Sequence, residues 1–337
     1  MTTRVFPFAV CCALLSAVPA TAEKTTGFDR PAGTVTASPY EYAKSGAKAD
    51  RAKAAGDGGA KVIGGELAAD GAWPWQVALL VGGMEAGTDS QFCGGSLVMD
   101  QWVLTAAHCV VMMDDDGSSR ALWPQDIGIL AGTNVLAPEA GDLIPVEAIF
   151  SHPSYVPALF DFDIALIKLS RPPQVAYQTI GVPDGEYGDI LNQQGVTTIV
   201  TGWGLTEGAV QTADLRQAEI QMLDRDLCNA AMMEARAEDA AGGFTYAAQA
   251  LGIAEDDAYA VWEDMLARAP MPVSENMICS GTFEGGKTSC NGDSGGPLVV
   301  PLDDGTYIQA GIVSWGLTGM EGMGCEETAL FSAYTNI

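Results

Sequence analysis

Short apolar runs, each ended by glycine, proline or aspartate, follow one another along the chain from about residue 62. Runs of roughly four to eight apolar residues between turn-forming residues are typical of β-strands. The clearest examples lie at residues 76–81, 95–98, 102–105, 164–169, 197–203, 297–300 and 312–316. Their number and short spacing predict an all-β protein built of barrels or sandwiches.

One stretch of the chain has a different pattern, because residues 229–270 are rich in alanine, methionine, glutamate and aspartate. This composition and pattern predict two helices, over residues 229–241 and 255–269. The pair Gly242-Gly243 is expected to separate them, since glycine disfavours helix interiors. We therefore expect a helical insertion, about residues 229–274, within the β-rich part of the chain.

The first 61 residues contain no strand pattern and divide into two segments. In residues 1–22, Arg4 precedes an apolar stretch over 5–18 and the sequence Ala-Thr-Ala at 20–22, as in a cleavable secretory signal peptide. The apolar stretch is too short and too interrupted by proline for a membrane span. Residues 23–61 are rich in Ala, Gly, Lys, Ser and Thr, which predicts a flexible segment without a core element. The sequence thus predicts a secreted protein, extracellular or periplasmic, without membrane attachment.

The charge of the chain is strongly acidic, with a formal net charge of −27 at pH 7. Half of the basic residues lie within the first 61 positions, so the remainder is more acidic still. Such a surface repels nucleic acids and anionic membranes, and we expect neither as a partner. The acidic surface either attracts cationic substrates or simply keeps the protein soluble, and both interpretations stay open.

Eight cysteines are present, and Cys11 and Cys12 fall within the predicted signal peptide. An even number of remaining cysteines in an exported chain predicts disulfides, and six cysteines allow fifteen pairings. A zinc site fits the sequence less well, because these cysteines form no Cys-x-x-Cys pair. The six are Cys93, Cys109, Cys228, Cys279, Cys290 and Cys325.

Three short motifs carry side chains that can perform nucleophilic catalysis. Residues 292–297 read GDSGGP, residues 105–109 read TAAHC, and residues 161–166 read DFDIAL. A serine hydroxyl is protonated at neutral pH and needs a neighbouring base, and that base needs an acid to orient it. The sequence GDSGG also matches the Gly-x-Ser-x-Gly motif of α/β-hydrolases, but in that fold the histidine follows the serine. Both histidines here, His108 and His152, precede Ser294, which excludes that class.

These motifs resemble those of the chymotrypsin-like, trypsin-fold serine peptidases, and their order of histidine, aspartate and serine is the order of that family. The resemblance covers about residues 62–337. It implies two antiparallel Greek-key β-barrels, residues 62–175 and 176–337, with the active site in the cleft between them.

The resemblance implies a role for each residue of the motifs. Ser294 is the expected nucleophile, His108 the general base, and Asp163 the residue that orients His108. Asp163 is preferred to Asp161 because it alone directly precedes Ile-Ala-Leu. The second histidine lies in a Ser-His-Pro sequence and is assigned no catalytic role. The backbone N–H groups of Gly292 and Ser294 are expected to form the oxyanion hole.

The sequence Lys-Val-Ile-Gly-Gly at residues 61–65 resembles the activation site of the family. Cleavage after Lys61 would free the amino group of Val62, which then pairs with Asp293 and completes the loop before the serine. We therefore expect residues 23–61 to be a propeptide and the protein to be a zymogen. A pocket that rejects lysine cannot accept Lys61, so such a pocket implies a separate, trypsin-like activating protease.

Substrate specificity is expected to depend on four residues that correspond to the family's pocket. Thr288 lies at the floor, Gly316 at the mouth and Ser332 in the wall, while Ser314 corresponds to the residue that hydrogen-bonds the triad aspartate. Trypsin-like members carry an aspartate at the floor, so threonine favours medium or large uncharged side chains before the scissile bond. A preference for basic side chains stays open, because three glutamates lie close by in the sequence. They are Glu321, Glu326 and Glu327.

The resemblance also pairs the cysteines, as Cys93–Cys109, Cys228–Cys279 and Cys290–Cys325. The calcium loop of some relatives corresponds to residues 133–142, which include Glu139 and Asp142. Thr133 stands there where a carboxylate is expected, and six oxygen ligands are not evident. We therefore predict neither a metal nor a cofactor.

Two classes of function are compatible with these observations. The first is a secreted serine endopeptidase, a monomer that acts on protein or peptide substrates and meets a protein inhibitor. The second is a catalytically silent binding protein on the same scaffold, with the acidic insertion as its docking surface. The first is favoured because the three triad residues and Gly292 are all present. By resemblance the insertion lies near the substrate cleft, where it is a lid, an exosite, a docking surface or a decoration without catalytic role.

Overall fold

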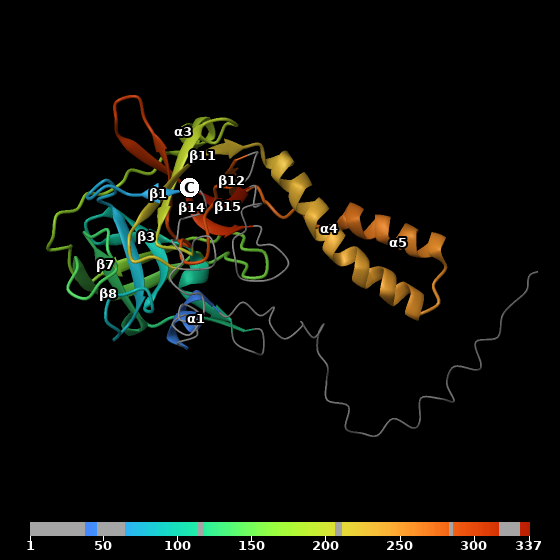
Figure 1. The fold of residues 1–337 in the computed structure, drawn as a ribbon, viewed down its shortest axis with the longest axis horizontal. Coiled ribbons are helices and arrows are strands. Elements are labelled where there is room, and N and C mark those ends of the chain that lie inside the picture. Colours follow the sequence, from blue (N-terminus) through green and yellow to red (C-terminus); the bar gives the residue numbers. More distant parts are fainter. Residues whose placement is uncertain (1–37, 46–64, 114–117, 206–210, 283–285, 317–330) are drawn as a thin grey trace, which may run out of the picture. The chain divides into compact units, whose positions relative to one another are not determined.

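The computed structural model describes residues 38–45, 65–113, 118–205, 211–282, 286–316 and 331–337. The predicted signal peptide, Lys61, Val62 and Cys325 lie outside these residues, as do the three glutamates near the predicted pocket. Antiparallel strands are the most frequent regular elements in the described part of the chain (Figure 1).

The first barrel consists of six strands that close on themselves in the order β2-β3-β4-β9-β8-β7. All of its strand pairs are antiparallel. The strands are β2 (Gln76–Val81), β3 (Gln91–Met99), β4 (Trp102–Thr105), β7 (Ile127–Ala131), β8 (Asp142–Ser151) and β9 (Ala165–Leu169).

The second barrel has the strand order β11-β10-β13-β14-β15-β12, and a pairing of β11 with β12 closes it. In chain order, each barrel therefore arranges its strands first, second, third, sixth, fifth and fourth, which is a Greek-key order. The predicted all-β, two-barrel fold is confirmed. The strands are β10 (Thr197–Gly202), β11 (Arg216–Leu223), β12 (Met277–Gly281), β13 (Pro297–Pro301), β14 (Tyr307–Gly316) and β15 (Phe331–Asn336).

Strand β1 (Glu66–Leu67) joins the second barrel, although residues 62–175 were assigned to the first. The sheet of the second barrel therefore includes residues 66–67, while the division of the chain at residue 175 stays a prediction. Strand β1 can pair there because β12 covers only residues 221–223 of β11. Residues 216–217 at the other end of β11 are left open on that edge, and β1 pairs with them. The chain just after the predicted cleavage site is thus fixed to the second barrel.

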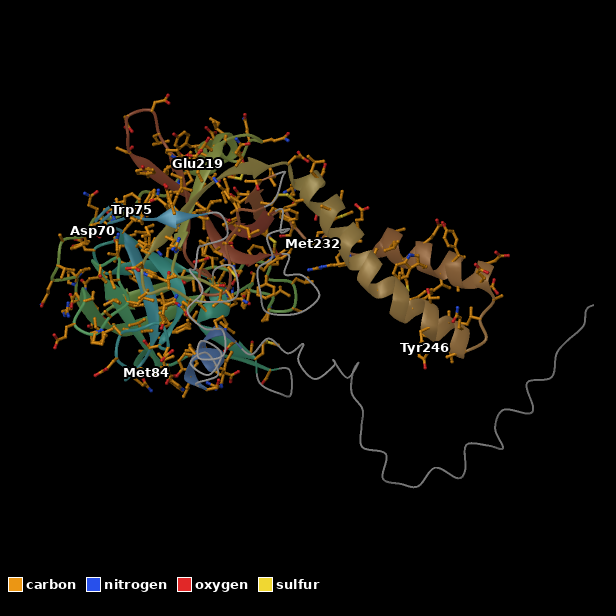
Figure 2. The ribbon with its side chains drawn as sticks, viewed as in Figure 1. Asp70, Trp75, Met84, Glu219, Met232 and Tyr246 are labelled. Carbon is orange, nitrogen blue, oxygen red and sulfur yellow. A yellow bond between two sulfur atoms is a disulfide. The ribbon has the colours of Figure 1, made fainter. Side chains whose placement is uncertain are left out.

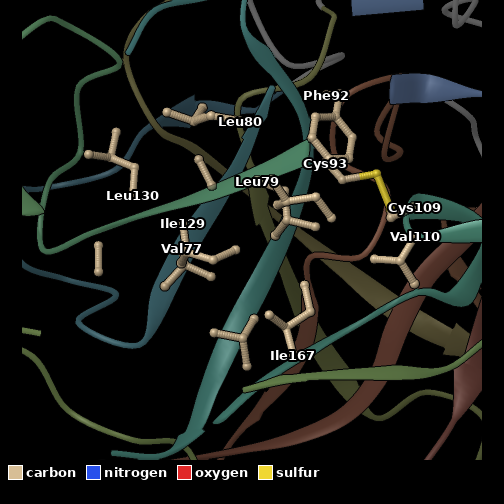
Figure 3. Close-up of a cluster of buried hydrophobic side chains, with 14 of the residues drawn as sticks. Val77, Leu79, Leu80, Phe92, Cys93, Cys109, Val110, Ile129, Leu130 and Ile167 are labelled. Atoms are coloured by element: carbon tan, nitrogen blue, oxygen red, sulfur yellow. A yellow bond between two sulfur atoms is a disulfide. The ribbon is translucent and has the colours of Figure 1, made fainter. Parts of the chain in front are cut away.

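Branched aliphatic side chains fill the first barrel, and they come from alternate positions of facing strands. Figure 3 shows Val77, Leu79, Ile129 and Ile167 among these side chains, all with no exposed surface. Burying one such side chain stabilises the folded state by about 1.5–3 kcal/mol. The core therefore makes the barrel a firm support for the loops at its ends.

Several short elements complete the barrels. They are β5 (Val111–Met113), β6 (Ser119–Ala121), the 3₁₀ helices η1 (Ala107–Cys109) and η2 (Pro124–Asp126), and helix α3 (Gly185–Leu191). The β5 and β6 strands form a separate two-stranded sheet. Among the described residues, no helix is long and apolar enough to cross a membrane.

The predicted insertion is a helical hairpin of α4 (Arg225–Ala250) and α5 (Glu255–Arg268), which lie side by side (Figure 1). The prediction that Gly242-Gly243 separates the helices is wrong, because α4 runs through both glycines. The helix ends instead near Gly252, whose φ of 67° is a left-handed conformation that glycine adopts readily. The N–H of Gly252 donates to the Gln249 carbonyl and that of Ile253 to the Ala248 carbonyl, which is a Schellman motif.

The base of the hairpin is fixed to the second barrel, whereas most of its length is exposed. A disulfide joins Cys228 to Cys279, and the Asn229 side chain both donates to and accepts from the Val273 backbone. Figure 2 labels Met232, which is buried on α4, and Tyr246 on the same helix, which is 75% exposed. Helix α5 has no buried residue.

A helix also forms within the segment predicted to be flexible. Helix α1 (Pro39–Lys44) packs against the first barrel, with Tyr40 and Ala43 both buried in its core. The prediction that residues 23–61 contain no core element is therefore wrong for this stretch. Ser38 caps the helix and proline occupies its first turn, a pattern that signals a helix start even in a polar segment.

Candidate active site

Asp163 and His108 form the buried centre of the site. The His108 Nδ1 atom lies 2.7 Å from the Asp163 Oδ2 atom, and the backbone N–H of His108 donates to Asp163 Oδ1 over 2.8 Å. The Ser314 hydroxyl donates to the same Oδ2 over 2.6 Å, and the Thr335 hydroxyl donates to the Asp163 carbonyl. The Asp163 carboxylate has no exposed surface and His108 is 9% exposed. Both carboxylate oxygens are thus used, as burial of a charge requires.

The first barrel positions both residues. His108 lies in η1, directly after β4, and a disulfide between Cys93 and Cys109 ties this helix to β3 (Figure 3). Asp163 closely precedes β9, which pairs with β4. Adjacent strands therefore deliver both residues at the same end of the first barrel, and Ser314 and Thr335 of the second barrel complete the hydrogen bonds of Asp163.

Ser294 lies on the loop before β13 and is brought to the first barrel through its backbone. Its carbonyl accepts the Gly94 N–H over 2.7 Å, next to the Cys93–Cys109 disulfide. The Cys109 sulfur lies 3.8 Å from His108 Nε2, and it would lie 3.1 Å from a Cβ atom placed on Gly295. The Cys109 sulfur therefore lies close to both the serine loop and the Nε2 atom of His108. Among the described residues, no hydrogen bond joins the Ser294 hydroxyl to His108.

Two N–H groups on this loop are available to a ligand. Within the described part of the chain, neither the Gly292 nor the Ser294 N–H donates to an acceptor. Gly292 has a φ of 101°, a conformation that side chains resist, and its carbonyl accepts the Gln91 side-chain N–H over 2.8 Å. Gln91 thereby fixes the peptide that joins Gly292 to Asp293. Free N–H groups two residues apart suit a negatively charged oxygen.

Asp293 is buried between these two donors, at 2% exposure. Its carboxylate accepts the N–H of Gly204 over 2.7 Å and that of Cys290 over 2.8 Å. Burial raises the pKa of Asp293 to about 6, and the two hydrogen bonds only partly oppose this rise. No cation lies within ion-pair distance of Asp293 among the residues that the structure describes. Asp293 is therefore a buried acid without a counter-ion there.

The residues of the predicted pocket form a cluster of hydroxyl groups. The Thr288 and Ser332 hydroxyls lie 2.6 Å apart, and the Ser289 hydroxyl donates to Ser332 over 2.8 Å. A Cβ atom on Gly316 would lie 3.0 Å from the Ser332 hydroxyl, so Gly316 faces the same group. Burial raises the pKa of the neighbouring Tyr334, which therefore stays neutral. Every described group in this cluster is uncharged.

Two aromatic residues flank the triad. The Phe160 ring meets His108 edge to face, with ring centroids 5.6 Å apart, and its backbone has a positive φ of 54°. Trp315 directly follows Ser314, and the guanidinium of Arg236 on α4 lies 5.6 Å from the centre of its ring. Phe160 and Trp315 pack against the apolar cluster that buries Met232. The base of the insertion therefore contacts both flanking residues through one cluster.

The remaining predicted residues lie as follows. His152 stacks on Phe162, with centroids 4.9 Å apart, and within the described ranges it forms no hydrogen bond with Asp163 or Ser294. Asp161 accepts hydrogen bonds from Ser274 and Asn276 and so joins the two barrels.

Two predicted disulfides are present, and Cys290 is also disulfide-bonded, although its predicted partner lies outside the described residues. In the loop compared with a calcium site, both Asp142 oxygens bind Arg171. This ion pair lowers the pKa of Asp142.

Three contributors were not predicted from the sequence: Gln91, Phe160 and Thr335. The first two carry no distinctive motif, and their roles depend on contacts with chain segments far away in sequence. Thr335 follows a tyrosine in the last strand, and only the pairing of β15 with β14 brings it to Asp163. Knowledge of the strand register would have identified Thr335, whereas no sequence motif marks it.

Two Greek-key barrels, with histidine and aspartate from the first and serine from the second, are the architecture of one class of serine proteases that use a triad. The trypsin family model matches residues 62–336. The chain therefore belongs to the trypsin family of serine proteases.

Three curated relatives are similar over 82% of this chain. It is 32% identical to Suppressor of tumorigenicity 14 protein homolog of Bos taurus, over 27% of that protein. It is 28% identical to Transmembrane protease serine 9 of Rattus norvegicus, over 21% of that protein, and 29% identical to Serine proteinase stubble of Drosophila melanogaster, over 30%. The chain thus spans less than a third of the length of each.

Proposed function

We propose that this protein is a secreted serine endopeptidase, which hydrolyses peptide bonds through an acyl-enzyme on Ser294. The observation that carries the proposal is the Asp163 carboxylate, which binds His108 through both its ring and its backbone and accepts the Ser314 hydroxyl. A carboxylate at Nδ1 leaves Nε2 as the proton acceptor of the imidazole and stabilises the imidazolium that forms.

The reaction proceeds in two stages. The Ser294 oxygen attacks the substrate carbonyl while His108 Nε2 takes the hydroxyl proton, and the tetrahedral intermediate then collapses as His108 gives that proton to the leaving amine. A water molecule repeats the same sequence on the acyl-enzyme and releases Ser294. The serine in the unliganded site need not be hydrogen-bonded to the base, because such contacts often tighten only with substrate bound.

The negative oxygen of each intermediate is bound by the N–H groups of Gly292 and Ser294. Both groups lack an acceptor within the described residues, so neither must break a bond in the chain to bind substrate. One such donor contributes about 3–4 kcal/mol to stabilisation of the transition state.

Specificity and activation follow from the surroundings of this site. The uncharged hydroxyls of Thr288, Ser289 and Ser332 favour medium or large uncharged side chains before the scissile bond.

Cleavage after Lys61 supplies the Val62 ammonium to Asp293, the buried acid without a counter-ion in the described residues. A separate, trypsin-like protease makes that cut, because an uncharged pocket rejects lysine. Substrates are proteins or peptides, a protein inhibitor is a further partner, and the enzyme acts as a monomer.

A catalytically silent binding protein on the same scaffold is the alternative. It is disfavoured because an inactive relative has no use for a fully hydrogen-bonded carboxylate at a histidine. Selection for docking alone would not maintain this arrangement against the cost of burying a charge.

The test is hydrolysis of a peptide library by the chain after cleavage at Lys61. We expect turnover with cuts after uncharged side chains, and a loss on the order of 10⁶-fold in Ser294→Ala. Ser170→Ala, an exposed serine, is the matched control and should keep full turnover. Equal turnover by Ser294→Ala and the unaltered chain would rule out the proposal, and cuts mainly after lysine or arginine would rule out the uncharged pocket.

A further inference from the structure

Helix α1 lies before the predicted cleavage site, yet it is part of the core of the first barrel. Tyr40 is 4% exposed and Ala43 is 2% exposed, and both belong to the same buried cluster as Cys93 and Cys109. Lys61 lies 17 positions beyond Lys44, so a cut there leaves the helix itself intact. Cleavage would thus sever α1 from the barrel that it packs on.

The surface under α1 is apolar and adjoins the histidine of the site. The helix contacts β2, β3 and η1, the element that carries His108. The Tyr40 ring meets Phe92 edge to face, with centroids 5.5 Å apart and an angle of 87°. Phe92 directly precedes Cys93, whose disulfide holds η1 (Figure 3). The Tyr40 ring therefore covers Phe92, next to the disulfide that holds the helix of His108.

The attachment of α1 depends on the tether rather than on a strong interface. Residues 23–61 contain no cysteine, so no disulfide can retain them after a cut. A six-residue helix is not stable by itself in water and must be ordered by the surface it binds. In the uncut chain the covalent connection makes the binding of α1 intramolecular, which raises its local concentration to the order of millimolar, and that advantage disappears when the connection is cut.

We propose that cleavage after Lys61 turns α1 into a dissociable ligand, and that its departure opens an apolar docking site at Phe92. The occupant of this site is the segment around Pro39–Lys44, bound in the uncut chain and released on dilution of the cut one. The inference rests on the proposed activation cleavage, but it requires no catalysis by Ser294.

The experiment uses the full chain with Ser294→Ala, so that the protein cannot digest itself. Gly58→Asp, Gly59→Asp and Ala60→Asp, together with the native Asp57, create four aspartates before Lys61. Enteropeptidase cuts after that sequence and leaves Val62 as the new terminus. The cut chain is diluted, passed over a size-exclusion column, and analysed by mass spectrometry. We expect the N-terminal fragment to elute apart from the fragment that begins at Val62.

A labelled synthetic peptide of residues 34–48 then measures the docking site by fluorescence anisotropy. We expect it to bind the cut, fragment-free chain, and to bind the uncut chain more than about tenfold more weakly, because α1 already occupies the site. A Tyr40→Ala peptide should bind the cut chain more than about tenfold more weakly, and a Glu41→Gln peptide should bind like the unaltered one.

Co-elution of the fragment with the cut chain would overturn the release of α1. Equal binding of the unaltered and Tyr40→Ala peptides, or binding of neither, would overturn the docking site. None of these results bears on catalysis, which is read separately from hydrolysis by the chain that retains Ser294. An inactive but fragment-releasing protein would contradict the proposed function and leave this inference standing.

Discussion

Asp163 and Asp293 are both removed from solvent, but their surroundings are complete to different degrees. Asp163 receives hydrogen bonds on both oxygens and lies against an imidazole that can carry a positive charge. Asp293 receives two backbone N–H groups and no cation among the described residues, and burial raises its pKa to about 6. Asp163 therefore has both hydrogen bonds and a neighbouring group that can carry the opposite charge. Asp293 has hydrogen bonds but no opposite charge among the described residues.

The difference follows from where the partners come from. Those of Asp163 are supplied by η1 and β14, elements that fold without any covalent change. Those of Asp293 are backbone groups, which reduce but do not remove the cost of burying a charge. We infer that the Asp163–His108 pair is assembled in the uncut chain and that activation supplies the missing opposite charge to Asp293.

Among changes to the two buried aspartates and their partners, Asp163→Asn should have the largest effect. An amide at this position stabilises the wrong imidazole tautomer while preserving the shape of the site, so kcat of the activated enzyme should fall about 10⁴-fold. The matched control is Asp161→Asn on the same loop, which should change kcat far less because Asp161 binds Ser274 and Asn276. Similar losses in both variants would remove the distinction between the two aspartates of this loop.

Asp293→Asn should have the next largest effect, and only on the cut chain. Removing one partner of a buried ion pair costs about 3–5 kcal/mol, which corresponds to a loss of roughly 150–5,000-fold in kcat/KM if activation depends on the pair. The uncut variant should match the uncut unaltered chain, and the exposed Asp304→Asn is the control. If the cut fully activated the Asp293→Asn enzyme, activation would not depend on a negative charge at residue 293.

Stability of the uncut chain should depend on pH through Asp293. Its pKa rises from 3.8 to about 6 on folding, so the folded state binds more protons between these values and stability decreases as pH rises from about 4 to 6. The difference corresponds to about 3 kcal/mol. Urea unfolding at several pH values should show this decrease in the uncut chain and not in uncut Asp293→Asn. The same decrease in both chains would mean that another group causes it.

Ser314→Ala should have the smallest effect of the four. It removes one hydrogen bond to a charged group, worth about 2 kcal/mol, and leaves the two bonds from His108. We expect kcat of the activated enzyme to fall roughly 10–100-fold, with KM little changed. A loss as large as that of Asp163→Asn would indicate that Ser314 acts on the reaction directly.

Local patterns were sufficient to predict the strands, and the resemblance of the three motifs to the family implied the two barrels and the triad residues. Alternating apolar runs specify strands, and the three motifs identify His108, Asp163 and Ser294 in the family's order. What no motif carries is the contact between distant segments. Thr335 and Gln91 hold Asp163 and Gly292 from strands whose register the sequence does not specify.

The two helical errors arose because intrinsic propensity is a weak guide: unfavourable residues at one or two positions do not by themselves end a helix, and packing can order a polar segment. Gly242 and Gly243 each cost about 1 kcal/mol in a helix, yet α4 continues to the Schellman motif at Gly252. Helix α1 lies in a polar, glycine-rich segment, and burial of Tyr40 and Ala43 on the barrel outweighs that composition. In both cases local composition alone misplaces the helix.

If the Asp163–His108 pair is assembled before the cut and the cut completes the surroundings of Asp293, the reactivity of Ser294 must rise on cleavage. The most direct measurement is the rate at which a fluorophosphonate labels Ser294 before and after cleavage at Lys61. We expect slow labelling of the uncut chain, labelling of the cut chain that is faster by about 100-fold or more, and no acceleration in Asp293→Asn. Equal rates before and after the cut, or no labelling of Ser294 in the cut chain, would contradict it.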